Sequence, residues 1–91
     1  MNSGPKPVFK IFYAKSVEKD LRGIPIENLQ KIKKEIDHLI EFPDVKNVKK
    51  LTHHPVSDFR LKVGNYRVLF DVDTTNKAIY ILKIGHRKEV Y

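Results

Sequence analysis

Hydrophobic and polar residues alternate along two short stretches in the second half of the chain, and this pattern predicts a β-hairpin. The stretches Phe59–Val63 and Tyr66–Val72 are rich in β-branched and aromatic residues and are separated only by Gly64-Asn65. A two-residue loop that begins with glycine is typical of a type II′ turn. Because that loop sets the register of the two strands, we expect Lys62 to lie directly opposite Arg67.

The predicted hairpin has one apolar face and one cationic face, because successive side chains of a strand point to opposite sides of a sheet. The apolar face, which we expect to be core, carries Phe59, Leu61, Val63, Tyr66, Val68 and Phe70. The other face carries Arg60, Lys62, Arg67 and Leu69. Like charges on neighbouring strands cost stability, so such a face is either simply solvated or holds an anion. The hairpin alone does not favour one of these interpretations over the other.

The chain before the hairpin predicts one strand and two helices. Val8–Ala14 is rich in β-branched and aromatic residues and has the composition of a strand. A short helix is expected over Val17–Arg22, with Ser16 as its N-cap. Apolar residues at helical spacing predict a second helix over Ile26–Glu41, which Phe42-Pro43 ends. We expect the two helices to form a hairpin that covers one face of the sheet.

The segments around the β-hairpin complete a single α+β domain over residues 1–91. Residues 44–57 are expected to be a connector, and the nearly continuous apolar run Ala78–Gly85 predicts a central strand. Simple alternation would place Ala78, Tyr80, Leu82 and Ile84 in the core, and Ile79, Ile81 and Lys83 on the cationic face. The predicted fold is an N-terminal strand, a two-helix hairpin and an antiparallel meander of three strands. The helices cover one sheet face, and the other face is open and basic.

The positive charge of the chain indicates what kind of partner it binds. The formal net charge is +7, from 18 Lys and Arg residues against 11 Asp and Glu residues. Between positions 44 and 67 there are two acidic residues and six cations, namely Lys46, Lys49, Lys50, Arg60, Lys62 and Arg67. Clustering of this kind favours a phosphate-bearing partner over mere solubility.

Composition excludes several classes of protein. The chain has no cysteine, which rules out thiolate zinc sites and disulfide frameworks, and its histidines lack metal-ligand spacing. We therefore predict no metal and no cofactor. No apolar run approaches the roughly 20 residues that a membrane helix needs. A cytoplasmic protein is expected.

Four short motifs resemble the RelE/ParE superfamily of toxins, and the RelE branch more than the ParE branch. They are Leu61-Lys62, Tyr66-Arg67-Val68, Ile84-Gly85-His86-Arg87 and Glu89-Val90-Tyr91. The resemblance implies the toxin of a type II toxin–antitoxin system, a metal-independent endoribonuclease that cuts mRNA in the ribosomal A site. It also implies a RelB-like antitoxin as partner. We expect an amphipathic helix of the antitoxin to bind to the helix hairpin, and acidic residues of the antitoxin to lie against the basic face. Because the chain ends at Tyr91, we expect the C-terminal helix of some relatives to be missing.

By this resemblance the catalytic residues are Arg60, Lys62, Arg67, Arg87 and Tyr91. Further contacts with RNA or ribosome are expected from Lys46, Lys49, Lys50, Lys83 and His86. Lys62 is the candidate base for the 2′-OH, because the surrounding positive charge favours its neutral amine. His86 is the alternative, because histidine is the usual general base near neutral pH. Arg67 and Arg87 would stabilise the phosphate from exposed positions, and Tyr91 would stack on a base.

Two other functions remain open at this stage. A ParE-like toxin would inhibit DNA gyrase by binding and would have no nuclease activity. A plain nucleic-acid-binding module would hold phosphates on its basic face without cutting. Retention of the full cationic set favours the nuclease.

Overall fold

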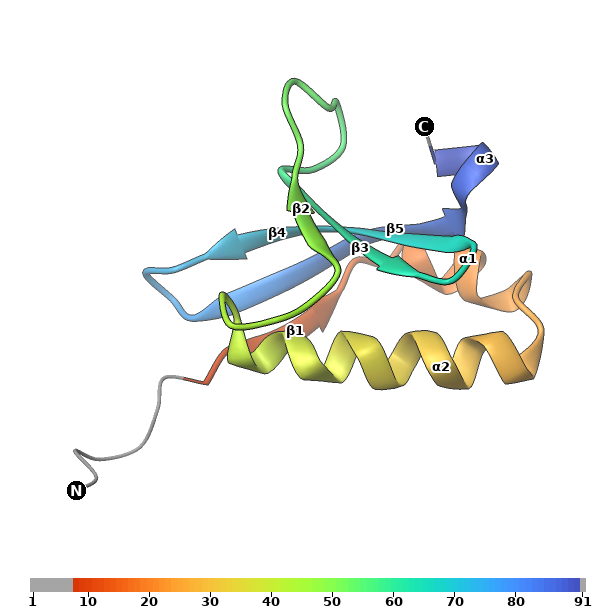
Figure 1. Cartoon of the computed structure of the whole chain (residues 1–91), viewed down its shortest axis with the longest axis horizontal. Coiled ribbons are helices and arrows are strands. Elements are labelled where there is room, and N and C mark those ends of the chain that lie inside the picture. The colour runs from red at the N-terminus through yellow and green to blue at the C-terminus, as the bar shows by residue number, and fades with distance from the viewer. Residues whose placement is uncertain (1–7, 91) are drawn as a thin grey trace.

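The computed structural model describes residues 8–90, in which five strands form one mixed sheet with the two N-terminal helices on one side (Figure 1). The strands are β1 (Lys10–Tyr13), β2 (Val48–Lys50), β3 (Phe59–Val63), β4 (Tyr66–Asp73) and β5 (Ala78–His86). The helices are α1 (Val17–Arg22), α2 (Ile26–Asp37), the 3-10 helix η1 (His38–Glu41) and α3 (Arg87–Val90). The spatial order is β1-β5-β4-β3-β2, with β1 parallel to β5 and the other neighbours antiparallel. The predicted α+β class is confirmed.

The β3–β4 hairpin has the predicted register. Lys62 pairs with Arg67 and Leu61 pairs with Val68, and the other three pairs follow in step. Gly64 begins the two-residue turn with a φ of 58°, a backbone conformation that glycine adopts without a steric penalty. A strongly local signal therefore determined the centre of the sheet.

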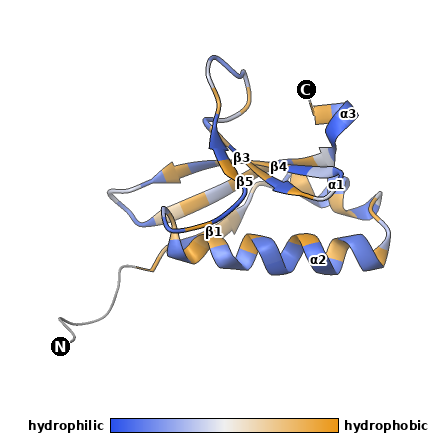
Figure 2. Cartoon of the chain, in the orientation of Figure 1, coloured by the Kyte–Doolittle hydropathy of each residue, from blue (hydrophilic) through white to orange (hydrophobic). Residues whose placement is uncertain are grey.

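The core lies between the sheet and the helices, as the apolar patterns predict. Ile32 and Ile36 of α2 are buried, and in Figure 2 the hydrophobic positions of that helix recur turn by turn among hydrophilic ones. They belong to the same buried cluster as Leu61 and Val68 of the sheet. On the opposite side of the sheet from α2, the loop of residues 51–58 and helix α3 project outward (Figure 1). This second side of the sheet lies between the loop and α3, and it forms the floor of the candidate site.

A β-bulge changes which residues of β5 reach the core. Leu69 pairs with Lys83 but the next residue, Phe70, pairs with Ile81, so Leu82 is an extra residue on β5. Alternation therefore switches sides at Leu82. The prediction was wrong for the residues before the bulge: Ile79 and Ile81 are fully buried in the core, whereas Tyr80 is 40% exposed. Ala78 is buried, but alternation puts it on the same side as Tyr80. Leu82 is partly exposed and lines a cleft beside α1. After the bulge, Ile84 is in the core and Lys83 is on the cationic face, as predicted.

Three further features differ from the predictions. The expected connector contains β2, which pairs with β3 and so depends on a contact that local sequence does not reveal. Residues 87–90 form the short helix α3, where no C-terminal helix was expected. Ser16 makes no side-chain cap hydrogen bond, because it has helical φ and ψ whereas an N-cap residue needs an extended conformation. The bounds of α1 are as predicted, and the last turn of the predicted long helix is η1.

Candidate nucleic-acid interface

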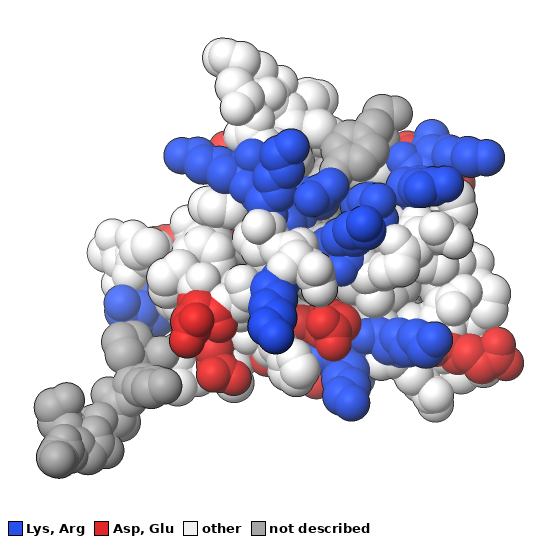
Figure 3. Space-filling model, viewed as in Figure 1, with Lys and Arg blue, Asp and Glu red and all other residues white. Residues whose placement is uncertain are grey.

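Lysine and arginine side chains gather on the side of the sheet that α1 and α2 leave uncovered. Figure 3 shows them concentrated above α2, between the projecting loop of residues 51–58 and α3, whereas most acidic side chains visible in that view lie lower. We call this surface the basic face and define it by Lys49, Arg60, Lys62, Arg67, Lys83 and Arg87. A surface of one sign attracts polyanions and raises their local concentration.

Strand pairing arranges the basic face in two rows. In the first row, Lys49, Arg60, Leu69 and Lys83 follow one another across β2, β3, β4 and β5. In the second row, Lys62, Arg67 and Gly85 are paired across β3, β4 and β5. Directly paired residues have Cβ atoms about 4.5–5.5 Å apart, so Lys49 and Arg60 form one close pair of cations, and Lys62 and Arg67 form another. Leu69 is fully buried between the cations of the first row and gives them an apolar floor.

Arg67 differs from its expected role as an exposed arginine. Its side chain is only 7% exposed, and its Nη1 donates hydrogen bonds to the carbonyl oxygens of Gly64 and Tyr66, each at 2.9 Å. The guanidinium therefore folds back on the hairpin turn that precedes it. The Nε atom is buried and has no hydrogen-bond partner within the part of the chain that the structure describes. The expectation of an open position for Arg67 was wrong, because two carbonyl groups of its own turn accept hydrogen bonds that an exposed arginine would donate to water.

Arg87 is exposed at the start of α3, which rests on the basic face. The main-chain N–H of Arg87 donates a 2.8 Å hydrogen bond to the carbonyl oxygen of Asn65, so the helix is tied to the hairpin turn. Val90, three residues later, is buried. Gly85 leaves room for this helix, since a Cβ built there would lie 3.0 Å from Cγ2 of Val90. Arg87 thus stands above the sheet beside the row of Lys62 and Arg67.

His86 lies on the other side of the sheet from the cations. It pairs with Tyr66, whose side chain packs against the core, and the two rings meet edge to face with centroids 5.9 Å apart. The phenol oxygen of Tyr66 accepts a 3.3 Å hydrogen bond from Asn28 of α2, and Nδ1 of His86 accepts one of 3.3 Å from the main-chain N–H of Lys88. To act as the alternative base, His86 would have to lie on the cationic face, but its pairing with Tyr66 places it on the other side of the sheet.

Comparison with known proteins identifies the family. A sequence model of the ParE toxin of the type II toxin–antitoxin system parDE matches residues 11–91. The chain belongs to this family of toxins. It is 33% identical to the putative toxin RelE1 of Methanocaldococcus jannaschii over 85 residues, which are 91% of this chain and 94% of the relative. It is 29% identical to the toxin RelE3 of the same organism over 86 residues, which are 90% of this chain and 94% of the relative.

The fold of the toxin is that of solved RelE structures. The archaeal RelE–RelB complex of Pyrococcus horikoshii matches with a TM-score of 0.71 at 29% identity, over 88% of this chain and 96% of the other. The RelBE2 complex of Mycobacterium tuberculosis matches with a TM-score of 0.76 at 22% identity, over 88% of this chain and 99% of the other. At that lower identity the likeness concerns the fold alone. The chain is therefore a RelE/ParE superfamily toxin of a type II toxin–antitoxin system, as its motifs suggested.

The remaining cations of the toxin are divided between different surfaces. Lys50 pairs with Phe59, so it points to the opposite side of the sheet from Lys49. Lys46 lines a separate hollow beside the end of α2. Sequence reasoning missed Lys31 and Lys34 of α2, which line a hollow of about 330 Å³ together with Lys62. The helical period hid them, because they occupy the polar side of α2 and only the tertiary fold brings them to the edge of the basic face.

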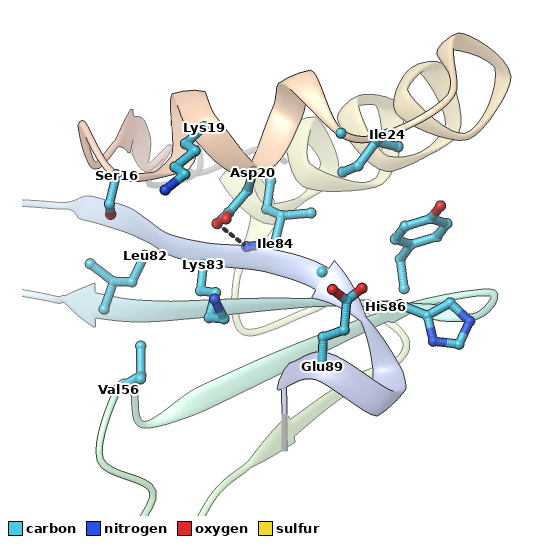
Figure 4. Close-up of a pocket in the computed structure, with 13 residues that line it drawn as sticks. Ser16, Lys19, Asp20, Ile24, Val56, Leu82, Lys83, Ile84, His86 and Glu89 are labelled. Carbon is cyan, nitrogen blue, oxygen red and sulfur yellow. Dashed lines mark hydrogen bonds between the residues drawn. The ribbon is translucent and has the colours of Figure 1, made fainter.

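A second hollow of the toxin lies beside the bulge of β5. This cleft of about 760 Å³ runs between α1 and the end of β5 (Figure 4). Strand β1 pairs with β5 only as far as Ile81, so the next stretch of β5 has no strand on the edge that faces away from β4. Figure 4 shows Asp20 reaching from α1, where its Oδ2 accepts a 3.1 Å hydrogen bond from the main-chain N–H of Ile84. Asp20 thus satisfies a backbone group that the short β1 leaves unpaired.

Two other kinds of site were sought in the described part of the toxin. Residues 8–90 hold no group of three or more His, Cys, Asp or Glu side chains placed to bind a metal ion. Over the same range, none of the helices combines the length and the apolar character required to cross a membrane.

Proposed function

We propose that this toxin is a ribosome-dependent endoribonuclease that cuts mRNA in the A site without a metal ion. The observation that carries the proposal is the arrangement of the basic face, where rigid strands hold Lys62 opposite Arg67 and beside Arg60. Two relatives that the chain matches along nearly its whole length are named RelE toxins, which supports the same branch. An exposed amine and fixed guanidinium groups supply what cleavage of a phosphodiester requires.

In the proposed reaction Lys62 removes the proton from the 2′-OH. The 2′-oxygen then forms a bond to the adjacent phosphorus, and the bond from phosphorus to the 5′-oxygen breaks. The departing 5′-oxygen takes a proton from water and Lys62 releases its proton to solvent, which leaves a 2′,3′-cyclic phosphate and a 5′-hydroxyl. Arg60 and Arg87 stabilise the charge that gathers on the phosphate oxygens. Lys62 is preferred to His86 as the base, because Lys62 is exposed on the cationic side and His86 is on the helix side. Tyr91 remains the proposed stacking residue and lies outside the described residues.

Lys49 and Lys83 complete the proposed RNA contacts on the same face. Lys49 is exposed at the edge strand β2, and Lys83 is partly exposed on β5. Because the first row spans the width of four strands, it can follow several phosphates of an extended strand. Lys46, Lys50 and His86 lie away from this row, and we propose that any contact they make is with the ribosome.

We propose a RelB-like antitoxin as the protein partner. Solved relatives of the same fold are complexes of RelE with RelB, which supports this partner. An apolar groove of about 310 Å³ between α1 and α2 suits one face of an amphipathic helix. Its apolar lining comes from Tyr13, Leu21, Leu29, Ile32 and Ile36. An acidic segment of the antitoxin would meet the basic face.

Gyrase inhibition is the second candidate function. It is favoured by one observation, namely that the matching family model is that of the ParE toxin. A supercoiling assay with purified gyrase tests this candidate directly. If the toxin inhibits gyrase by binding and not by nuclease chemistry, its inhibition of supercoiling should persist when the proposed base Lys62 is replaced.

The experiment for the nuclease is in vitro translation of a defined mRNA, followed by mapping of the new 5′ ends. We expect cuts within A-site codons only when ribosomes are present, and loss of these cuts in Lys62→Ala. Lys15→Ala is the matched control, because it removes the same charge from an exposed turn before α1, away from the basic face. The proposal would be overturned if the toxin stopped translation while the mRNA stayed uncut. It would also be overturned if Lys62→Ala cut the mRNA as well as the unmodified toxin does.

A further inference from the structure

Helix α3 is too short to hold its own position. It has four residues, and isolated helices of about 12–15 residues are already marginal in water. Its place above the sheet must therefore come from contacts with the rest of the fold. Three such contacts are the hydrogen bond from the Arg87 N–H to the Asn65 carbonyl, the hydrogen bond from the Lys88 N–H to His86, and the packing of Val90.

Val90 is seated in the space that Gly85 leaves empty. Gly85 is paired with Arg67, so a side chain at position 85 would project from the basic face beside the Arg67 guanidinium. An added Cβ would lie 3.0 Å from Cγ2 of Val90 and 4.0 Å from Cβ of Glu89. Val90 is 7% exposed, so its side chain is almost completely covered. The fit is close enough that a methyl group at position 85 requires the Val90 side chain to shift by a few tenths of an ångström. We expect α3, which this side chain holds against the sheet, to shift with it.

The packing of Val90 against Gly85, which we call the seat of Val90, determines the position of Arg87. Residues three apart are neighbours on the surface of a helix, so the exposed Arg87 lies next to the buried Val90 on α3. If Val90 is displaced, Arg87 rotates or rises with it, because a single turn of helix moves as one piece. The cation contributed by α3 is thus aligned with Lys62 and Arg67 through a contact that involves no charge.

We propose that Gly85 and Val90 are positioning residues, which set the placement of Arg87 over the basic face without touching RNA themselves. The catalytic part of this inference rests on the proposed nuclease function. The seat itself is a property of the fold and can be tested without any substrate.

The test uses three variants: Gly85→Ala, Val90→Ala and the double variant. Gly85→Ala should lower kcat of mRNA cleavage about tenfold with little change in KM, because a displacement of less than 1 Å in a catalytic group already costs rate. In the double variant the Cγ2 that collides is gone, so the rate should recover severalfold over Gly85→Ala. Gly23→Ala is the matched control, because the nearest atom to an added Cβ there is a carbonyl oxygen at 3.8 Å and its φ of −89° suits alanine.

Hydrogen exchange of the Arg87 amide separates the two levels of the proposal. Its hydrogen bond to Asn65 should open more often in Gly85→Ala and be protected again in the double variant. If exchange follows this pattern but the unmodified toxin does not cut mRNA, the nuclease proposal fails and the seat stands. Unchanged exchange in Gly85→Ala, or a double variant no better than Gly85→Ala in both measurements, would overturn the seat.

Discussion

Lys62 and Arg67 lie directly opposite each other on β3 and β4, yet their side chains are in different environments. Arg67 is 7% exposed and bonded to its own turn, whereas Lys62 is exposed at the edge of the basic face. Because one guanidinium is buried and fixed and the neighbouring amine is exposed, the two side chains have different roles. Arg67 holds the turn and supplies positive charge, and Lys62 can approach a substrate.

Replacing Arg67 by Ala should therefore weaken the fold as well as cleavage. The carbonyl groups of Gly64 and Tyr66 lose a charged donor, and we expect the free energy of unfolding to fall by about 1–3 kcal/mol. Urea denaturation measures the change. Arg67→Lys should recover little, because one ammonium group cannot reproduce the guanidinium geometry. Unaltered stability of Arg67→Ala would mean that these hydrogen bonds contribute nothing to the turn.

Arg87→Ala should act on cleavage alone. Arg87 is exposed, so the free energy of unfolding should change by less than about 0.5 kcal/mol. Loss of its charge near the scissile phosphate should lower kcat by about 10²–10³-fold. Single-turnover cleavage on programmed ribosomes provides the measurement, with Lys88→Ala, its exposed neighbour on α3, as the control. Cleavage at the unmodified rate would remove Arg87 from the proposed site.

Leu61→Ala should be among the most destabilising substitutions of the sheet. Leu61 is 2% exposed and belongs to the core cluster with Ile32 and Ile36, so we expect a loss of about 2–5 kcal/mol. Leu82→Ala is the informative comparison and should cost less, because Leu82 is the partly exposed residue of the bulge. Equal costs in thermal or urea unfolding would contradict the bulge.

Tyr13 should titrate above the ordinary range of tyrosine. Burial raises its pKa, and the carboxylate of Asp37 raises it further. Because the folded state favours the neutral phenol, the stability that this group contributes is complete below the ordinary pKa, about 10, and is lost as pH rises through the raised value. The difference in absorbance titration between the toxin and Tyr13→Phe isolates this residue. Asp37→Asn should lower the pKa only part of the way, because burial remains.

The complex with an antitoxin should have one salt-sensitive part and one salt-insensitive part. Contacts of an acidic segment with the basic face should weaken as ionic strength rises, whereas packing in the groove between α1 and α2 should not. Leu29→Ala, which alters the groove lining, should lower affinity by a similar factor at every salt concentration. Calorimetric titration across ionic strength measures both. Affinity that is flat with salt would leave no role for the basic face in antitoxin binding.

The features that sequence alone determined are those with local causes. The two-residue turn at Gly64-Asn65 and the alternation around it specified the register of β3 and β4, and therefore the pairing of Lys62 with Arg67. Helical spacing of apolar residues specified which side of α2 meets the sheet. The motifs around Tyr66 and Gly85 were sufficient to suggest the superfamily. Each of these signals lies within a few residues of the structure that it predicts.

Tertiary structure alone decided the features that depend on distant partners. The bulge at Leu82 reversed the faces of the residues before it, because the partner strand and the core decide which way a nearly continuous apolar run is turned. Burial of Arg67 followed from the carbonyl groups that its turn presents, and the separation of His86 from the cations followed from its pairing with Tyr66. The seat of Val90 over Gly85 needs a strand and a helix to meet in three dimensions. Alternation and helical period describe one element at a time, and these relationships exist only between elements.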